Sequence, residues 1–181
     1  MSLNGKTILV GVSAGIAAYK AADLVSKLRQ GGAQVIVVMT PAACRFVTPL
    51  TFETLSGRPV LTNLFDERPS PTPDHVALAD QADAAVVAPA TADVLAKMAV
   101  GIADDALTTA LVTFDGPVVV CPAMNTKMWQ HPTVGQNLDT LRARGVRVVE
   151  PGSGWLACGT EGVGRLADIE QILAAIDALF Q

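Results

Sequence analysis

Five short apolar runs, separated by longer segments with a helical pattern, most constrain what this chain can fold into. The runs are Thr7–Val12, Gln34–Met39, Ala84–Ala88, Pro117–Cys121 and Val146–Val149. Parallel strands that are covered on both faces read as continuous valine-rich runs of this kind, whereas a strand with one wet face alternates. We therefore expect an α/β fold, with a three-layer, doubly wound parallel sheet of the Rossmann or flavodoxin-like type.

The segments between the runs carry apolar residues at the spacing of amphipathic helices. We expect helices at residues 16–28, 92–100, 104–112, 133–144 and 169–179. Residues 41–55 predict short helices, and the proline-rich stretch 68–74 predicts a loop. Residues 151–164 are rich in glycine and show no period, so no regular element is expected there.

Composition limits the classes of function. With 181 residues, of which 50% are hydrophobic and 17% charged, the chain can bury one sizeable core, so we expect a single domain over residues 1–181. The formal net charge is −4 and basic residues do not cluster, which argues against nucleic-acid binding. No apolar segment has the length of a signal peptide or a membrane span, so we expect a cytoplasmic protein without a membrane partner.

The cysteines and the mean hydropathy add two expectations. Cys44, Cys121 and Cys158 include no C-x-x-C pair, so neither a disulfide framework nor a metal site is expected. The mean hydropathy of +0.40 is high for a monomer, and extra apolar surface commonly forms subunit interfaces. We therefore expect a homo-oligomer, although a valine- and alanine-rich sheet covered on both faces also raises hydropathy.

Ligands of doubly wound sheets bind at the carboxyl ends of the strands, so the loops after the first four strands matter most. The first loop, Gly11-Val-Ser-Ala-Gly15, matches the G-x-S-x-G pattern of a hydrolase nucleophile elbow. That elbow normally follows several strands, and no Asp-then-His pair completes a triad, since His131 stands before a proline in a turn. We favour an anion site in which Ser13, Gly15 and the N–H groups of the first helix hold a phosphate. A plain turn with Ser13 as helix cap remains the alternative.

A clue to the kind of phosphate comes from the second strand. A dinucleotide fold would place G-x-G-x-x-G in the first loop and an acidic residue at the end of the second strand. Here that strand ends in Met39, Thr40 and Pro41. A hydroxyl at this position suits a mononucleotide phosphate better than an adenosine ribose, which favours FMN over NAD.

Further polar groups near the strand ends are candidates for chemistry. Thr91 and Asp93 follow the third strand, where they can bond the edge of a flat ring or simply cap a helix. His75 lies at a loop exit, although an isolated histidine is more often structural than catalytic. Cys158 lies in the glycine-rich segment, and a place on a lid explains it better than core packing.

The stretch Pro-Ala-Met-Asn-Thr-Lys-Met-Trp, residues 122–129, follows the fourth strand, and its Asn125 has no evident structural duty there. It matches the P-x-M-N-x-x-M-W signature of the flavin-dependent cysteine decarboxylases. Other segments occur in that family's order: His75-Val-x-Leu, Ala82-Asp83, Pro89-Ala-Thr-Ala-Asp93 and Ala157-Cys-Gly159. The chain therefore resembles this family over most of its length, from about Lys6 to Ile176.

The resemblance implies bound FMN and the substrate phosphopantothenoylcysteine, which the coenzyme A branch of the family converts to 4′-phosphopantetheine and CO2. In that chemistry the flavin oxidises the thiol to a thioaldehyde, which serves as the electron sink for decarboxylation, and the enethiol is then re-reduced. The resemblance also implies a homotrimer, or a dodecamer of trimers, with the active site between subunits. In many bacteria the domain is the amino-terminal half of a bifunctional protein with a synthetase, so we expect a stand-alone enzyme or a separated domain.

Carried over position by position, the resemblance implies roles for individual residues. His75 would be the base for the thiol or a group that aligns it, Asn125 would hold the substrate carboxylate, and Cys158 would donate the final proton. Lys127 and Arg165 are candidates for the substrate phosphate by charge and proximity to the motifs. The remaining implied contacts are Ala123 and Met124 with the substrate, and Ser13, Ala14, Gly15, Ile16, Thr40, Phe46, Thr91, Asp93 and Ala123 with the flavin.

Two positions depart from the family pattern. Asp93 stands where asparagine is frequent, and it accepts hydrogen bonds but cannot donate them. Gln81 stands where tryptophan is frequent.

Two other functions stay open. A peptidyl-cysteine decarboxylase acts on the terminal cysteine of a peptide, but its product keeps the double bond and needs no proton donor such as Cys158. A non-catalytic flavin-binding regulatory protein would lack the histidine, the asparagine or the cysteine, and this chain has all three.

Overall fold

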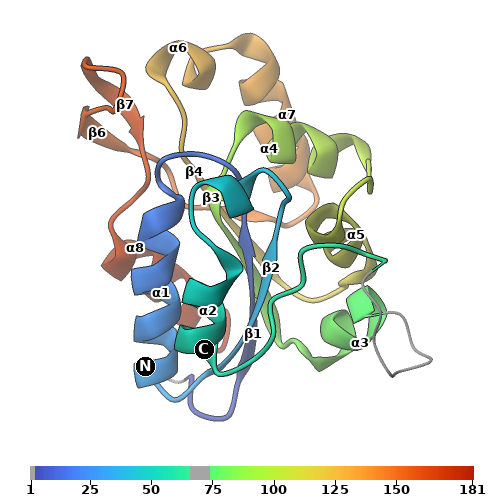
Figure 1. Ribbon diagram of the computed structural model, residues 1–181. Coiled ribbons are helices and arrows are strands. Elements are labelled where there is room, and N and C mark those ends of the chain that lie inside the picture. Colours follow the sequence, from blue (N-terminus) through green and yellow to red (C-terminus); the bar gives the residue numbers. More distant parts are fainter. Residues whose placement is uncertain (1–2, 66–73) are drawn as a thin grey trace.

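The computed structural model describes residues 3–65 and 74–181, and its centre is a five-stranded sheet. The strand order is β2-β1-β3-β4-β5, and every neighbouring pair is parallel (Figure 1). This is the flavodoxin-like order, whose topological switch lies between β1 and β3, so the expected fold class is confirmed. The strands are β1 Thr7–Val12, β2 Gln34–Met39, β3 Ala84–Ala90, β4 Val118–Pro122 and β5 Arg147–Val148.

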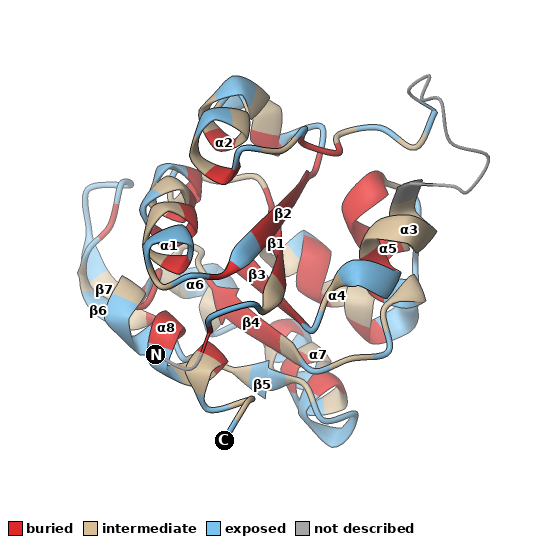
Figure 2. Cartoon of the chain, turned by 90° about the horizontal axis from the view of Figure 1, so that it is seen from below, coloured by how far each residue is buried: buried red, intermediate tan, exposed pale blue. Residues whose placement is uncertain are grey.

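Helices cover both faces of this sheet (Figure 2). One face carries α1 Ala18–Gln30, α2 Pro49–Ser56 and α8 Ile169–Asp177. The other face carries α4 Ala92–Val100, α5 Ala106–Thr113 and α7 Pro132–Ala143, and α3 Asp74–Gln81 packs beside α5. Within the two described stretches, none of the helices combines the length and the apolar character needed to cross a bilayer.

Alternation along the strands divides the core into two apolar clusters. Ile8, Val10 and Val12 pack with α1 and α8, whereas Leu9 packs with the helices of the opposite face. Every residue of β3 is buried, as expected for a central strand that is covered on both sides. The two layers cover the sheet, and the parallel pairing of β1 with β3 and of β3 with β4 brings the carboxyl ends of these strands to one edge.

Besides α3, which carries His75 where a loop exit was expected, two elements were not expected from the sequence. Residues 151–164 form an antiparallel hairpin of β6 Gly152–Trp155 and β7 Glu161–Arg165, so the prediction of no regular element there is wrong. Its glycines remove the alternation of apolar side chains by which a strand is recognised. The other element, α6 Thr126–Trp129, is a single turn. The loop expected at residues 68–74 lies outside the described residues, except that Asp74 begins α3.

Replacing a buried leucine of α1 tests how this helix layer stabilises the fold. Leu28 is fully buried, whereas Leu50 on α2 is 68% exposed. We expect Leu28→Ala to lower the free energy of unfolding by about 2–5 kcal/mol, because it removes buried contacts and leaves a cavity. Leu50→Ala, the matched control, should change it by less than about 0.5 kcal/mol. Urea denaturation followed by circular dichroism measures both, and equal losses would contradict the packing described.

Candidate functional site

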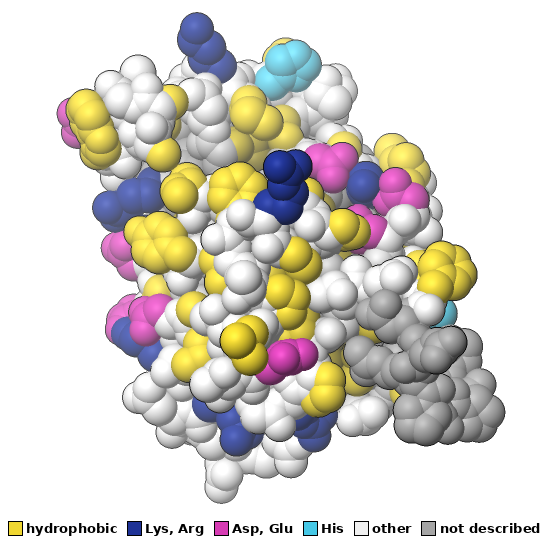
Figure 3. All heavy atoms as spheres, viewed as in Figure 1, with side chains coloured by type: hydrophobic (Ala, Val, Ile, Leu, Met, Phe, Trp, Pro, Cys, Tyr) yellow, Lys and Arg dark blue, Asp and Glu magenta, His cyan; other side chains and the backbone are white. Residues whose placement is uncertain are grey.

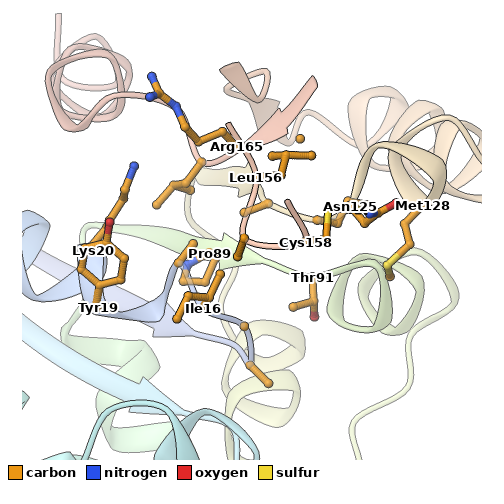
Figure 4. Close-up of a pocket in the computed structure, with 18 of the residues that line it drawn as sticks. Ile16, Tyr19, Lys20, Pro89, Thr91, Asn125, Met128, Leu156, Cys158 and Arg165 are labelled. Atoms are coloured by element: carbon orange, nitrogen blue, oxygen red, sulfur yellow. Dashed lines mark hydrogen bonds between the residues drawn. The ribbon is translucent and has the colours of Figure 1, made fainter. Parts of the chain in front are cut away.

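A cavity of about 450 Å³ opens at the carboxyl ends of β1, β3 and β4 (Figure 4). Four segments form its walls: the β1–α1 loop with the first turn of α1, the end of β3, the connection from β4 into α6, and the β6–β7 hairpin. Concave sites of this size with a few convergent polar groups commonly bind small molecules. The cavity also lies at the topological switch of the sheet, where doubly wound folds bind their ligands.

Ser13 fastens the β1–α1 loop to the end of β3. Its side chain is fully buried. The hydroxyl donates to the Pro89 carbonyl oxygen at 2.7 Å and accepts from the Thr91 N–H at 3.0 Å. Because the single hydroxyl proton is directed to a carbonyl rather than to a base, Ser13 is not arranged as a nucleophile. Its hydroxyl instead sets the spacing of two loops that line the cavity.

The walls near this junction fit a flat ring with an anionic tail. Ala14, Gly15 and Ala123 line the cavity with small side chains or none. A Cβ placed on Gly15 would find only one atom, the Thr91 Cγ2, within 4.0 Å, so the space beside this glycine is open. The first turn of α1 lies at the rim, and a helix N-terminus favours a phosphate there. These residues therefore fit FMN.

The Asn125 side chain caps a helix and also contacts a thiol in the cavity wall. Its Oδ1 accepts from the Lys127 N–H at 2.8 Å, so the side chain caps α6, and the expectation of no structural duty is wrong. The amide nitrogen is consequently free to donate, and Nδ2 donates to the Cys158 Sγ at 3.2 Å. The cap therefore determines which end of the amide faces the thiol.

The β6–β7 hairpin docks on the segment that leaves β4. The Met124 N–H donates to the Gly164 carbonyl oxygen at 2.9 Å, and the Thr126 hydroxyl donates to the Val163 carbonyl oxygen at 2.8 Å. Gly164 has a φ of +139°, and a Cβ there would overlap the Met124 carbonyl oxygen. This close backbone contact holds the hairpin where Cys158 reaches Asn125.

Cys158 is an exposed thiol at the hairpin tip, and its neighbours favour the thiolate. The Thr160 hydroxyl lies 3.1 Å from the Sγ atom. The hydrogen bond with Thr160, followed by that from Asn125, lowers the pKa of the Cys158 thiol below its usual range. Burial has the opposite effect on Cys44 and Cys121, whose thiol pKa values are raised. Cys158 is therefore the most acidic of the three thiols.

Most of the predicted site residues meet in this one cavity. Those that line it are Ala14, Gly15, Ile16, Thr91, Ala123, Met124, Asn125, Cys158 and Arg165. Ser13 and Thr40 lie buried at the same edge of the sheet but do not line the cavity, and the Thr40 hydroxyl accepts from the Ala43 N–H at the start of the short helix Ala43–Arg45.

Four other predicted residues lie outside the cavity lining. Phe46 and Lys127 are exposed. Asp93 forms an ion pair with Lys97 at 3.4 Å along α4. His75 is on α3, which lies far from α6 and the hairpin (Figure 1). Within one chain, the structure therefore brings Asn125 and Cys158 together but does not bring His75 to them.

Sequence reasoning missed several residues of the wall. Tyr19 and Lys20 line the cavity from α1. The helix expected at residues 16–28 places Lys20 on the same face as Ile16, four residues earlier, so the sequence pattern included Lys20, although α1 itself begins at Ala18. Trp155 and Leu156 line the cavity from the hairpin, and they were missed because the hairpin was missed.

Comparison with known proteins places the chain among flavoproteins. The sequence model described as Flavoprotein matches residues 1–181. The coenzyme A biosynthesis bifunctional protein CoaBC of Bacillus subtilis (strain 168) is 49% identical over 178 residues, which cover 98% of this chain and 44% of that protein. CoaBC of Mycobacterium tuberculosis (strain ATCC 25618 / H37Rv) is 48% identical over 176 residues, covering 97% and 42%. The chain thus spans less than half the length of these relatives.

Solved structures share the fold. The FMN-dependent cysteine decarboxylase SpaF superposes with a TM-score of 0.86 at 35% identity, covering 99% of this chain and 98% of its own. A mutant PPC decarboxylase complexed with pantothenoylaminoethenethiol also has a TM-score of 0.86, at 28% identity, covering 97% and 98%. This chain is therefore similar to both over nearly its whole length.

Gly164→Ala should separate the hairpin from the end of β4, because the added Cβ overlaps the Met124 carbonyl oxygen. We expect the Asn125–Cys158 contact to be lost, the pKa of the Cys158 thiol to rise toward its usual range, and the melting temperature to fall. Gly135→Ala on α7 is the matched control, since its Cβ would have no neighbour within 4 Å. Peptide-resolved alkylation and thermal melting measure both variants. An unchanged alkylation profile in Gly164→Ala would count against the docking.

Alkylation across a pH range tests the electrostatics of Cys158. Hydrogen bonds that stabilise the thiolate lower the thiol pKa, so Cys158 should be alkylated with a lower midpoint pH than Cys44 in the same sample. Thr160→Val should raise the Cys158 midpoint, and Asn125→Ala should raise it by a smaller amount. The Cys44 midpoint serves as the internal control and should not move. A Cys158 midpoint at or above that of Cys44 would refute this description.

Proposed function

This chain belongs to the Flavoprotein family, and on that premise we propose that it is an FMN-dependent carboxy-lyase that acts on phosphopantothenoylcysteine. The products are 4′-phosphopantetheine and CO2, in a step of coenzyme A biosynthesis that we place in the cytoplasm. The observation that carries the proposal is the Asn125–Cys158 pair in the wall of a cavity that fits FMN. The CoaBC relatives and the PPC decarboxylase structure support it.

The chemistry divides between the cofactor and the chain. When bound, FMN supplies the two-electron oxidation of the substrate thiol to a thioaldehyde, which accepts the electron pair left by CO2, and it supplies the reverse two-electron reduction of the enethiol, so no external redox partner is needed. The chain must orient the carboxylate, exclude water and deliver protons. Leu156, which is buried and lines the cavity beside Cys158, contributes to the exclusion of water.

Asn125 is suited to hold the carboxylate that leaves as CO2. Its amide has two N–H donors, of which one reaches Cys158 and the other is available to the substrate. The amide is neutral, and a cationic side chain would stabilise the carboxylate more than the transition state in which its charge is dispersed. Because the side chain also caps α6, its orientation is set before the substrate binds.

Cys158 is suited to deliver the last proton, to the carbon from which CO2 departed. Its lowered pKa makes it a stronger acid than an ordinary thiol. The thiolate that remains after the transfer is stabilised by Thr160 and Asn125. A peptidyl-cysteine decarboxylase, whose product keeps its double bond, has no use for such a donor.

The role proposed for His75, as the base for the thiol or a group that aligns it, requires an assembly. His75 does not line the cavity of its own chain, so we place the active site between subunits of a trimer-based homo-oligomer, in which a neighbouring chain contributes its own His75. Apolar side chains at the cavity support such an interface: Ile16 is 61% exposed and Tyr19 is 60% exposed. Figure 3 shows hydrophobic side chains spread over the face that carries α1 and α2.

The flavin contacts that we propose come from the loops at the carboxyl edge of the sheet. Ser13 and Thr40 act from behind the cavity wall, by fixing the loops that follow β1 and β2. The other proposed contacts are Ala14, Gly15, Ile16, Phe46, Thr91, Asp93 and Ala123.

The proposed function is tested by incubating the purified FMN-bound protein with phosphopantothenoylcysteine or with a peptide that ends in cysteine. We expect mass spectrometry to show 4′-phosphopantetheine from the first substrate and no reaction of the peptide. Cys158→Ser should still release CO2 but accumulate an enethiol that lacks the final two hydrogens, because its proton donor is gone. Cys44→Ser is the matched control and should form the normal product.

Two results would contradict these expectations. Unchanged phosphopantothenoylcysteine with the wild-type protein would refute the proposed function. Normal 4′-phosphopantetheine from Cys158→Ser would refute the role of Cys158 alone. A solved relative provides a precedent for the expected species, since a mutant PPC decarboxylase was captured with pantothenoylaminoethenethiol.

A further inference from the structure

Two cationic side chains stand at one end of the cavity, away from the Asn125–Cys158 pair. Lys20 enters from α1 and Arg165 from β7. Figure 4 shows both long side chains on the side of the cavity opposite Asn125 and Met128. The cavity therefore has a neutral, hydrogen-bonding end and a positively charged end.

Lys20 has no carboxylate partner among the described residues. Three other lysines, Lys6, Lys27 and Lys97, are each within 4 Å of at least one acidic side chain. Lys20 is partly buried and lines the cavity, yet no ion pair or hydrogen bond neutralises its ammonium group within residues 3–65 and 74–181. An unpaired cation in a concave site attracts anions, because the low-dielectric walls focus its field.

The Arg165 side chain lies against two glycines of β6. A Cβ on Gly152 or Gly154 would lie 3.8–4.0 Å from atoms of the Arg165 side chain, so the guanidinium rests across a strand without side chains at these positions. One nitrogen, Nη2, donates to Asp168 at 3.2 Å and holds the group in place. The guanidinium has five N–H donors, so several remain for a ligand.

We propose that Lys20 and Arg165 form a binding subsite for a phosphate monoester. The inference rests on the proposed function, whose substrate is an anion at both ends. Its carboxylate belongs at the Asn125–Cys158 end, and its phosphate matches the cationic end. The cofactor carries the same group on its ribityl chain, so the shared chemistry is a phosphate monoester and the source is decided by experiment. If the source is the substrate, Lys20 takes the role for which the sequence offered Lys127, which is exposed outside the cavity lining.

The subsite gives the enzyme a means of choosing phosphorylated molecules. Charge-assisted hydrogen bonds to phosphate are strong, and a site built to pair a charged group rejects the analogue that lacks it. Removing one cation should therefore lower kcat/KM or the binding affinity for the phosphorylated molecule by about tenfold or more. The same change should have little effect on the dephosphorylated analogue. The preference should also weaken at high salt, because the site is partly open to solvent.

The test compares matched pairs of molecules on the wild-type protein, Lys20→Gln and Arg165→Gln. One arm measures kcat/KM for phosphopantothenoylcysteine and for pantothenoylcysteine on the FMN-bound protein. The other arm measures the Kd of FMN and of riboflavin by flavin fluorescence. Lys20→Arg retains the charge and should retain the preference. Lys27→Gln, on the same helix but outside this cavity, removes one charge and should have no effect on either arm.

Each outcome decides the question. A selective loss of about tenfold toward phosphopantothenoylcysteine supports a subsite for the substrate phosphate. A selective loss toward FMN, with riboflavin binding unchanged, supports a subsite for the cofactor phosphate. The inference is overturned if a variant loses as much kcat/KM or affinity for the dephosphorylated molecule as for the phosphorylated one in both pairs. It is also overturned if neither pair shows a loss. Absence of turnover in the wild-type protein refutes the proposed function instead, and the fluorescence arm then still tests the subsite for the cofactor phosphate.

Discussion

The hydrogen bond from the Met124 N–H to the Gly164 carbonyl oxygen joins the β6–β7 hairpin to the end of β4, and the whole site depends on it. The sheet by itself delivers Asn125 at the carboxyl end of β4, but Cys158 comes from the hairpin. The contact is between backbones, so it tolerates no side chain at Gly164. A single glycine therefore controls the distance between the group proposed to hold the carboxylate and the group proposed to donate the proton.

On the other side of the cavity, hydrogen bonds of one buried hydroxyl connect two loops. The buried Ser13 hydroxyl ties the β1–α1 loop to Pro89 and Thr91 at the end of β3. The pattern that resembles a hydrolase elbow is therefore a structural link in a different kind of site. With the hairpin fixed on one side and the loop on the other, the small residues between them leave room for a flat cofactor, and the polar groups stand at the two ends.

Much of this architecture could be predicted from the sequence, and the exceptions have physical reasons. The bounds of β1 and β2 agree with the expected runs, because burial on both faces leaves an uninterrupted apolar signature. The hairpin was missed because its glycines and exposed positions leave no period to read. Lys20 stands four residues after Ile16 in the helix expected at residues 16–28, so the helical pattern indicated its place on the cavity side. Lys127, the lysine predicted for the substrate phosphate, is exposed on α6 outside the cavity lining. The carboxylate role of Asn125 stays a prediction, and the structure places this residue in the cavity wall. Its capping of α6 leaves no signal in the sequence, because a single helical turn has no period.

One side chain, that of Asn125, links the cap of a short helix to the acidity of a thiol. Asn125 accepts from the Lys127 N–H and donates to Cys158, so the fold of α6 and the proposed chemistry share one side chain. The most direct test follows the side-chain amide resonances of Asn125 by nuclear magnetic resonance while Cys158 is titrated. The account predicts that these resonances shift with a midpoint equal to the pKa of the Cys158 thiol, below its usual range. Amide resonances that do not respond to the titration would contradict it.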